Sequence, residues 1–179
     1  LTRTGNREKY FKKLKESILL QTYKNIRHIK SNDNKNCKYL ENETDVFYIN
    51  NMEKKNNFYN LYLNELLEKV EKDWVLVLDD DSKLISNLFI EKLARICENS
   101  NENEIIIFRS KVSEYGHLFP LHHHMLLKRY ALTFIDMACF CFHHSIKKEI
   151  KFDDRKYGDY NFLEKIKALT GPQDPIPIF

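Results

Sequence analysis

Three consecutive carboxylates follow an apolar run in the segment "WVLVLDDDSK", which spans residues 74–83. In an extended chain successive side chains point to opposite faces, so Asp79 and Asp81 face one way and Asp80 the other. Two carboxylates on one side suit a hard divalent cation such as Mn²⁺ or Mg²⁺, which takes oxygen ligands and commonly shares them with substrate phosphates. The segment therefore predicts a metal site for a phosphorylated substrate.

The same residues also have a purely structural interpretation. Asp80, Asp81 and Ser82 are residue types that often end a strand and begin a helix. Capping needs only one such residue, however, and it does not explain why a third carboxylate accepts repulsion at the end of a buried strand. We therefore favour the metal site and keep capping as the alternative.

The elements that would position these carboxylates alternate between amphipathic helices and apolar strands. Helical spacing predicts helices over residues 7–22, 57–72, 86–98 and 159–169, the first with Asn6 as its cap. Strands are predicted over residues 26–31, 45–50, 74–78, 104–108 and 132–142. The strands 74–78 and 104–108 are apolar on both faces, which indicates a three-layer α/β/α fold with a mainly parallel central sheet.

Length and composition fit one folded domain. The 179 residues are 42% hydrophobic and 31% charged, with four glycines and four prolines, which argues against disorder. The net charge of +3 comes from interspersed acidic and basic residues, so we expect no nucleic-acid binding. No apolar run approaches the ~18 residues of a membrane span and no leader peptide is visible, so we expect a cytoplasmic protein.

Two further expectations concern the start of the chain and the cysteines. The segment "LTRTGNR" reads as the end of a strand, so we expect a few residues ahead of Leu1. Cys139 and Cys141 alternate along an apolar run, so both should lie on one face of a strand. Buried reduced thiols are favoured over a disulfide or a zinc site.

The order of motifs in the first half resembles a known family. "TRTGNREKYFKKLKESILLQTYKNI", a strand with "SNDN", and "NNFYNLYLNELLEKVEKDWVLVLDDDSKL" together resemble a GT-A glycosyltransferase of the family 2 type. The resemblance is strongest to small glycosyltransferase domains of large DNA viruses, and it would place the protein in the host cytoplasm. It implies one GT-A domain over residues 1–179, with a nucleotide-sugar half followed by an acceptor half.

The resemblance also implies roles for individual residues. The donor would be a UDP-, GDP- or dTDP-linked sugar, and the acceptor a hydroxyl of a glycan or another molecule. Asp79 would approach the ribose and the sugar, and Asp81 would hold the Mn²⁺ or Mg²⁺ that bridges the diphosphate, with Asp79 as a second ligand. The remaining donor-binding positions would be Thr2, Arg3, Thr4, Arg7, Asp33, Asn57, Asn60 and Asp80.

The second half of the chain offers fewer matches. The general base of an inverting transfer would be Asp159, which is preceded by Gly158 where the family pattern more often has Glu, and a plain helix cap is an equal alternative. Asp136 interrupts an apolar run and would bind acceptor hydroxyls or pair structurally with Arg129 or a histidine. His144 is a possible additional metal ligand.

Together with these residues, the resemblance implies a metal-dependent inverting glycosyltransferase, and two other functions compete with it. One is a non-catalytic sugar-nucleotide or glycan-binding module. The other is a phosphatase of the haloacid dehalogenase type, whose strand also ends in Asp-x-Asp. That motif normally ends the first strand of its fold, whereas at least two strand–helix units precede Asp79 here.

Overall fold

The computed structural model describes residues 1–32, 37–49, 59–111, 116, 118–121, 135–153 and 157–170. Its helices are α1 (Glu8–Leu19), α2 (Tyr59–Glu68), α3 (Phe89–Cys97) and α5 (Gly158–Thr170), with short 3₁₀ helices η1 (Lys38–Leu40), η2 (Met137–Cys139) and η3 (His144–Lys148). Its strands are β1 (Thr2–Thr4), β2 (Lys30–Asn32), β3 (Val46–Tyr48), β4 (Trp74–Leu76), β5 (Ile105–Ile107), β6 (Ser110–Lys111), β7 (Leu118–Phe119) and β8 (Phe140–His143).

The central sheet is continuous and mainly parallel. Strands β1, β2 and β3 form parallel pairs, and β8 lies antiparallel between β4 and β5. Leu1 joins the two halves, because its amine donates to the carbonyl of Leu76 at 2.6 Å and its carbonyl accepts from the amide of Leu78 at 2.9 Å. The spatial order is therefore β3-β2-β1-β4-β8-β5, in which β8 runs against its neighbours.

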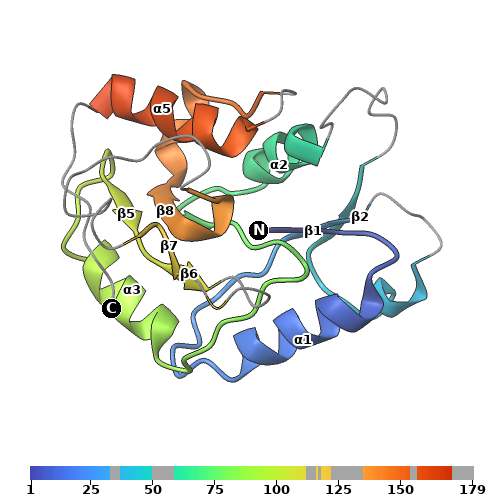
Figure 1. Ribbon diagram of the computed structural model, residues 1–179. Helices are drawn as coiled ribbons and strands as arrows, with labels where there is room; N and C mark the ends of the chain where they lie inside the picture. The colour runs from blue at the N-terminus through green and yellow to red at the C-terminus, as the bar shows by residue number, and fades with distance from the viewer. Residues whose placement is uncertain are drawn as a thin grey trace.

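Helices cover both faces of this sheet. Figure 1 shows α1 and α3 on one side and α2 and α5 on the other, so the molecule has three layers. The α2 and α5 side holds a large apolar core in which Leu66, Phe142 and Phe162 are buried. On the opposite side, α3 buries its residue Leu93 and α1 buries its residue Leu14 against the sheet. The three-layer α/β/α architecture predicted from the sequence is confirmed.

One predicted strand and two local predictions are wrong. The strand expected over 132–142 begins only at Phe140, because Met137–Cys139 forms a 3₁₀ helix that Asp136 caps through its side chain. Cys139 and Cys141 therefore pack in the cores on opposite sides of the sheet, although all four described cysteines are free thiols. The N-cap position of α1 is Arg7 and not Asn6, whose φ of 56° is left-handed.

The sequence also predicts no segment that crosses a membrane. Among the described residues, every helix is too short or too polar to span a bilayer.

Phe162 lies where α5 packs on the sheet and should be a major source of stability. Its ring is fully buried, stacks on Phe152 at a centroid distance of 3.8 Å and contacts Phe142 at 5.1 Å. Phe162→Ala should lower the free energy of unfolding by about 3–5 kcal/mol in urea titrations. Leu169→Ala, on the same helix but 52% exposed, should change it by at most about 0.5 kcal/mol. Equal effects of the two substitutions would contradict this packing.

Candidate active site at the carboxyl ends of the central strands

The predicted carboxylates lie where β1 and β4 end side by side. Because the two strands are parallel neighbours, their carboxyl ends share one edge of the sheet, where an open α/β fold forms its ligand crevice. The hydroxyl of Thr4 donates to Asp80 Oδ2 at 2.9 Å, and Tyr39 hydroxyl lies 2.9 Å from the same Thr4 oxygen. The end of one strand is thus tied directly to the end of the other.

Arg7 neutralises part of the negative charge at this edge. Its guanidinium lies 3.1 Å from Asp80 Oδ1 and 2.5 Å from Asp81 Oδ2, so one cation bridges two adjacent carboxylates. The Arg7 side chain is 39% exposed, whereas that of Asp80 is only 3% exposed. The buried carboxylate is therefore satisfied by Thr4 and Arg7 together, as a buried charge requires.

Asp79 and Asp81, which precede and follow Asp80 in the sequence, are both exposed to solvent. The pKa of Asp79 is raised to about 6, mainly because the surrounding protein removes part of its hydration, and then because Asp136 and Asp81 are negatively charged. Arg3 opposes this shift. Since water still reaches the side chain, its ionisation is weakened and not abolished. A carboxylate in this state would be stabilised by an added cation.

Two further carboxylates reach the same region from the second half of the chain. Asp136 precedes η2, and its Oδ1 accepts from the amide of Ala138 at 3.2 Å. Asp159 lies in the first turn of α5, where its Oδ1 accepts from the amide of Tyr160 at 2.9 Å. Burial, followed by the charge of Asp136, raises the pKa of Asp159. Asp136 therefore acts electrostatically on both Asp79 and Asp159, which places all three around one region.

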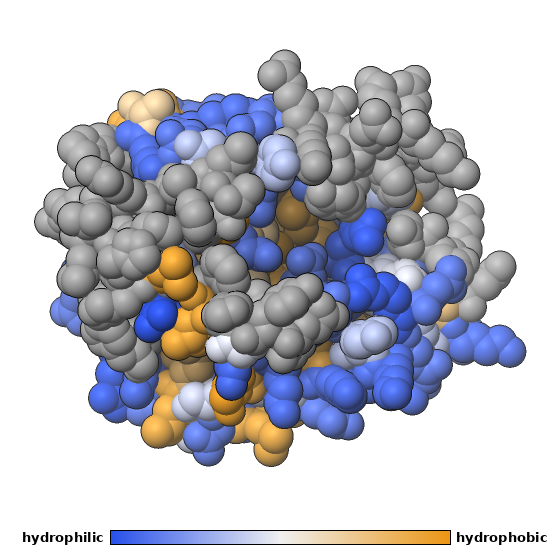
Figure 2. Space-filling view, viewed as in Figure 1, coloured by the Kyte–Doolittle hydropathy of each residue, from blue (hydrophilic) through white to orange (hydrophobic). Residues whose placement is uncertain are grey.

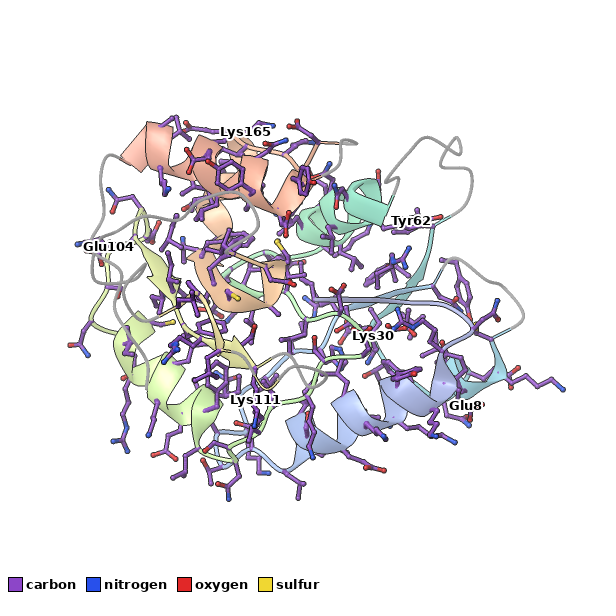
Figure 3. All side chains as sticks on the ribbon, in the orientation of Figure 1. Glu8, Lys30, Tyr62, Glu104, Lys111 and Lys165 are labelled. Carbon is purple, nitrogen blue, oxygen red and sulfur yellow. The ribbon has the colours of Figure 1, made fainter. Side chains whose placement is uncertain are left out.

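Arg3 and Tyr62 form the wall on the α2 side. The Arg3 guanidinium lies over the Tyr62 ring at 6.0 Å from its centroid, a cation–π arrangement. Figure 3 shows Tyr62 on α2 and Glu8 at the beginning of α1 on the side of the molecule toward which β1 runs. An aromatic ring and a second arginine thus flank the carboxylates.

The surface around this edge is hollowed. Figure 2 shows a central depression with hydrophilic residues along its lower right wall, where α1 lies. A second, open depression of about 530 Å³ is lined by Asn6, Arg7, Glu8, Lys9, Tyr10 and Lys12 at the beginning of α1. Basic and hydrogen-bonding groups therefore line surfaces that solvent reaches.

The structure does not bring every predicted residue to this edge. Asn60 is buried and its side-chain amide donates to the carbonyl of Asp153 at 2.8 Å, so it joins α2 to the segment before α5. Thr2 is buried with its hydroxyl 2.9 Å from His28 Nε2. Asp33 and Asn57 lie outside the described residues.

The structure places His144 at the other end of β4 from the carboxylates. The antiparallel register places the preceding residue, His143, opposite Trp74 at the start of β4, and the amide of His144 donates to the carbonyl of Asp73 at 3.0 Å. Asp79 lies five positions beyond Trp74, roughly 16 Å away at about 3.3 Å per extended residue. His144 instead contacts His143, with 3.3 Å between ring nitrogens.

Tyr39 and Tyr62 are the residues that sequence reasoning missed. Tyr39 contacts the Thr4 hydroxyl from η1, and Tyr62 lies beneath Arg3. Neither belongs to a motif, and Tyr62 reads as one more apolar position of an amphipathic helix. Only the tertiary arrangement reveals them.

The donor set at this edge fits a divalent cation that shares its ligands with a substrate. Asp79 and Asp81 supply exposed oxygen ligands, and the like charges around Asp79 favour an added cation. In the part of the chain that the structure describes, no three His, Cys, Asp or Glu side chains are grouped closely enough to hold a metal alone. Mg²⁺ is usually bound by one or two carboxylates, and substrate phosphates contribute further oxygen ligands.

Comparisons with known proteins identify a family and a fold. The model of the family described as "Glycosyl transferase family 2" matches residues 3–162. The crystal structure of TarS residues 1–349 from S. aureus superposes with a TM-score of 0.71 at 17% identity, covering 92% of this chain and 53% of TarS. Its complex with UDP gives 0.70 at 16% identity (93% and 53%), and its complex with UDP-GlcNAc gives 0.58 at 15% identity (85% and 47%).

These similarities concern the fold, and they extend over only part of TarS. The chain spans about half the length of the TarS structure. No curated protein sequence matches the chain.

The perturbed carboxylate gives a test that needs no ligand. Folded Asp79 has a pKa of about 6, whereas an unfolded aspartate has about 3.9, so the folded state holds the proton more tightly. Ionised Asp79 therefore costs stability as the pH rises from about 4 to about 6, and the cost is complete above that window. Wild type should lose stability relative to Asp79→Asn across this range in urea titrations.

Glu68→Gln controls for the change in net charge, because Glu68 forms a surface ion pair with Lys151. Parallel stability profiles for wild type and Asp79→Asn from about pH 4 to pH 7 would show that the site does not perturb this carboxylate.

Proposed function

Because this chain belongs to glycosyl transferase family 2, we propose that it transfers a sugar from a nucleotide-diphospho donor to a hydroxyl of an acceptor, with a divalent cation and with inversion. The observation that carries the proposal is the exposed pair Asp79 and Asp81 beside Arg7, where β1 and β4 end. The acceptor would be a glycan or another hydroxyl compound.

The arginines would bind the donor diphosphate. Arg7 already holds two carboxylates with its planar guanidinium, a group that also matches phosphate oxygens in a bidentate manner. Arg3 lies near Asp79 on the α2 side, where it would approach the other end of the donor. The TarS structures with UDP and UDP-GlcNAc support a uridine donor, with GDP and dTDP as the alternatives.

Asp81 and Asp79 would hold Mn²⁺ or Mg²⁺ against that diphosphate. When bound, such an ion neutralises the charge that builds up on the departing nucleoside diphosphate. Asp80 would act indirectly, because its bonds to Thr4 and Arg7 determine how the two outer carboxylates are presented. Thr4 thus belongs to the support of the site more than to its contact surface.

Asp159 is our candidate for the base that accepts the proton of the acceptor hydroxyl. Its raised pKa makes it a stronger base than an ordinary aspartate, and its place in the first turn of α5 fixes its direction. Its bond to the amide of Tyr160 leaves the second carboxylate oxygen for the acceptor. Asp136, which acts on both Asp79 and Asp159, would lie on the acceptor side.

Placement of the reactants would provide much of the rate. An inverting transfer passes through a transition state with oxocarbenium character, so the base must lie opposite the leaving group. Carboxylates contributed by β4 and by α5 approach the region from different elements, which suits opposite faces of one sugar.

One observation favours a second candidate, a non-catalytic sugar-nucleotide or glycan-binding module. Gly158 stands where the family pattern more often has Glu, and a Cβ there would lie 2.0 Å from the Asn60 side-chain nitrogen. A larger residue at position 158 would require the Asn60 side chain to shift. The phosphatase alternative has no comparable support in a chain of this family.

We also propose that residues 1–179 act as one GT-A unit, with donor binding in the first half and acceptor binding in the second. A cytoplasmic location and a viral origin stay predictions from the sequence.

The donor and metal assignments are tested by calorimetry with UDP, GDP and dTDP, each with and without Mn²⁺. One of the three should bind to wild type at least tenfold more tightly with Mn²⁺. Asp81→Ala should lose this metal effect and most of the affinity, because it removes an exposed oxygen ligand. Glu68→Ala, which removes a carboxylate from the exposed end of α2, should bind as wild type does. Absence of binding by all three nucleotides would overturn the proposal, and equal binding by Asp81→Ala would overturn the metal assignment.

The base assignment is tested by separating binding from turnover. Asp159→Asn should keep the affinity for the nucleotide but lower sugar release from the bound donor by about 10²–10⁴-fold, the usual contribution of a general base. Asp153→Asn is the matched control, because its carboxylate pairs with Lys165 on the same side of the molecule. Unchanged turnover in Asp159→Asn would leave it as a helix cap. Metal-dependent nucleotide binding without any turnover in wild type would favour the binding module.

A further inference from the structure

Large aliphatic side chains are exposed where α1 ends and α3 begins. They belong to Leu19, Leu20, Ile85 and Leu88, which we call the apolar tip. Ile85 is 76% and Leu20 71% exposed, more than any other large apolar side chain that the structure describes. Figure 2 shows apolar side chains at the lower edge of the molecule, where Figure 1 places the end of α1 and the beginning of α3. Single exposed apolar residues are ordinary on a protein surface, but several gathered at one place indicate a site of interaction.

Hydrogen bonds hold the two segments of the apolar tip together. The side chain of Gln21 donates to the carbonyl of Ser86 at 2.8 Å and accepts from the amide of Ile90 at 3.0 Å. The amide of Thr22 donates to the carbonyl of Asn87 at 2.9 Å. The aliphatic side chains of both segments therefore lie around one fixed junction.

The usual distribution of polar and apolar side chains is inverted at this junction. Gln21 and Ser17 are buried, and the hydroxyl of Ser17 accepts from the amide of Leu84 at 3.1 Å. Polar groups with buried hydrogen bonds thus occupy the inside, whereas Leu19 and Leu20 lie in water. Burying a leucine is favourable, so an arrangement that keeps two of them outside favours a partner that buries them.

Lysines lie beside both segments of the apolar tip. The ammonium group of Lys24 donates to the carbonyl of Leu19 at 3.0 Å, which places a positive charge next to the end of α1. Lys83 and Ile85 lie on either side of the buried Leu84 in the sequence, and both are exposed. Each aliphatic segment therefore has a lysine at its margin.

The outer faces of the two helices extend this positive charge. Lys13 lies two turns before Leu20 on the same face of α1, and Lys92 lies one turn after Leu88 on the same face of α3. Both lysines are exposed. Basic side chains thus continue from the apolar tip along both helices.

Two carboxylates lie among these lysines. Glu16 is exposed on α1, and Glu91 on α3 is already paired with Arg95 at 2.6 Å. The lysines outnumber the carboxylates, so the surface around the apolar tip is positively charged. Its electrostatic complement is an anionic surface.

The residue types at this surface distinguish between two kinds of partner. The cores of protein interfaces are enriched in aromatic residues and arginine and depleted in lysine. The apolar tip instead has aliphatic side chains at its centre and lysines at its margin. A bilayer suits this arrangement, because aliphatic groups enter the acyl region while lysine side chains reach back to the lipid phosphates. The positive charge favours a membrane with anionic lipids.

We propose that the apolar tip inserts into the surface of a bilayer that contains anionic lipids, with Lys24 and Lys83 at the lipid headgroups. α1 begins beside the carboxylates, next to Arg7, and ends at the apolar tip, and its 12 residues span about 18 Å. The apolar tip and the carboxylate site can therefore be altered separately. The inference does not depend on the proposed function.

The test measures sedimentation of the 179-residue chain with vesicles of phosphatidylcholine, either alone or with about 30% phosphatidylserine. Wild type should bind the anionic vesicles about tenfold more tightly than the neutral ones, and salt should weaken this binding. Ile85→Gln should weaken binding to the anionic vesicles by about fivefold or more, because one aliphatic side chain no longer enters the bilayer. Lys24→Gln should weaken it by about fivefold, because one positive charge is removed from the headgroup region.

Leu169→Gln and Lys151→Gln are the matched controls, because both side chains are exposed on the α2 and α5 side of the sheet. Each should bind vesicles as wild type does. Since Ile85 is exposed, Ile85→Gln should keep the thermal midpoint of wild type and its calorimetric affinity for nucleotide.

Equal binding of wild type to neutral and anionic vesicles would overturn the proposal. So would a loss of binding in Lys24→Gln without any loss in Ile85→Gln, because attraction between charges would then explain the binding without insertion. Self-association of wild type that Ile85→Gln abolishes would make a second copy the occupant and would also overturn it. Intact nucleotide binding beside any of these results would show that the membrane inference alone has failed.

Discussion

The bond between Thr4 and Asp80, reinforced by Arg7, is the constraint on which the rest of the site depends. It buries the middle carboxylate of three and holds the end of β4 against the end of β1. Asp79 and Asp81 are then presented to solvent on either side of a fixed point. Without that anchor, three adjacent negative charges would repel one another and the chain would leave the sheet early. One buried ion pair thus turns an unfavourable sequence into an ordered acidic edge.

The layered fold could be predicted from the sequence because its signals are local. Apolar spacing along α1 and α3, and runs such as the one that ends at Leu78, depend only on which side chains must leave water. The prediction of a strand over residues 132–142 was wrong for the same reason. In the sequence, a polar cap and a 3₁₀ turn at Asp136 look like a brief interruption of one apolar run. The antiparallel direction of β8 had no local signal.

The site residues at the end of a strand could be predicted from the sequence. Those whose position depends on packing between distant segments could not. The carboxylates after β4 could be placed because strand geometry decides which way they point. His144 could not be excluded from sequence, because its separation from them comes from an antiparallel register with β4. Asn60 was expected near the nucleotide, yet its amide is engaged by the carbonyl of Asp153 across the fold. Such contacts depend on residues nearly a hundred positions apart.

The close approach of Gly158 to Asn60 has a consequence for altering the beginning of α5. Any side chain at position 158 collides with an amide that is itself held in place by the neighbouring main chain. A larger residue there therefore requires the Asn60 amide to leave the Asp153 carbonyl, which itself would lie 3.0 Å from the added Cβ. Positions 60 and 158 are thus coupled, so a substitution at one changes the space that is available at the other.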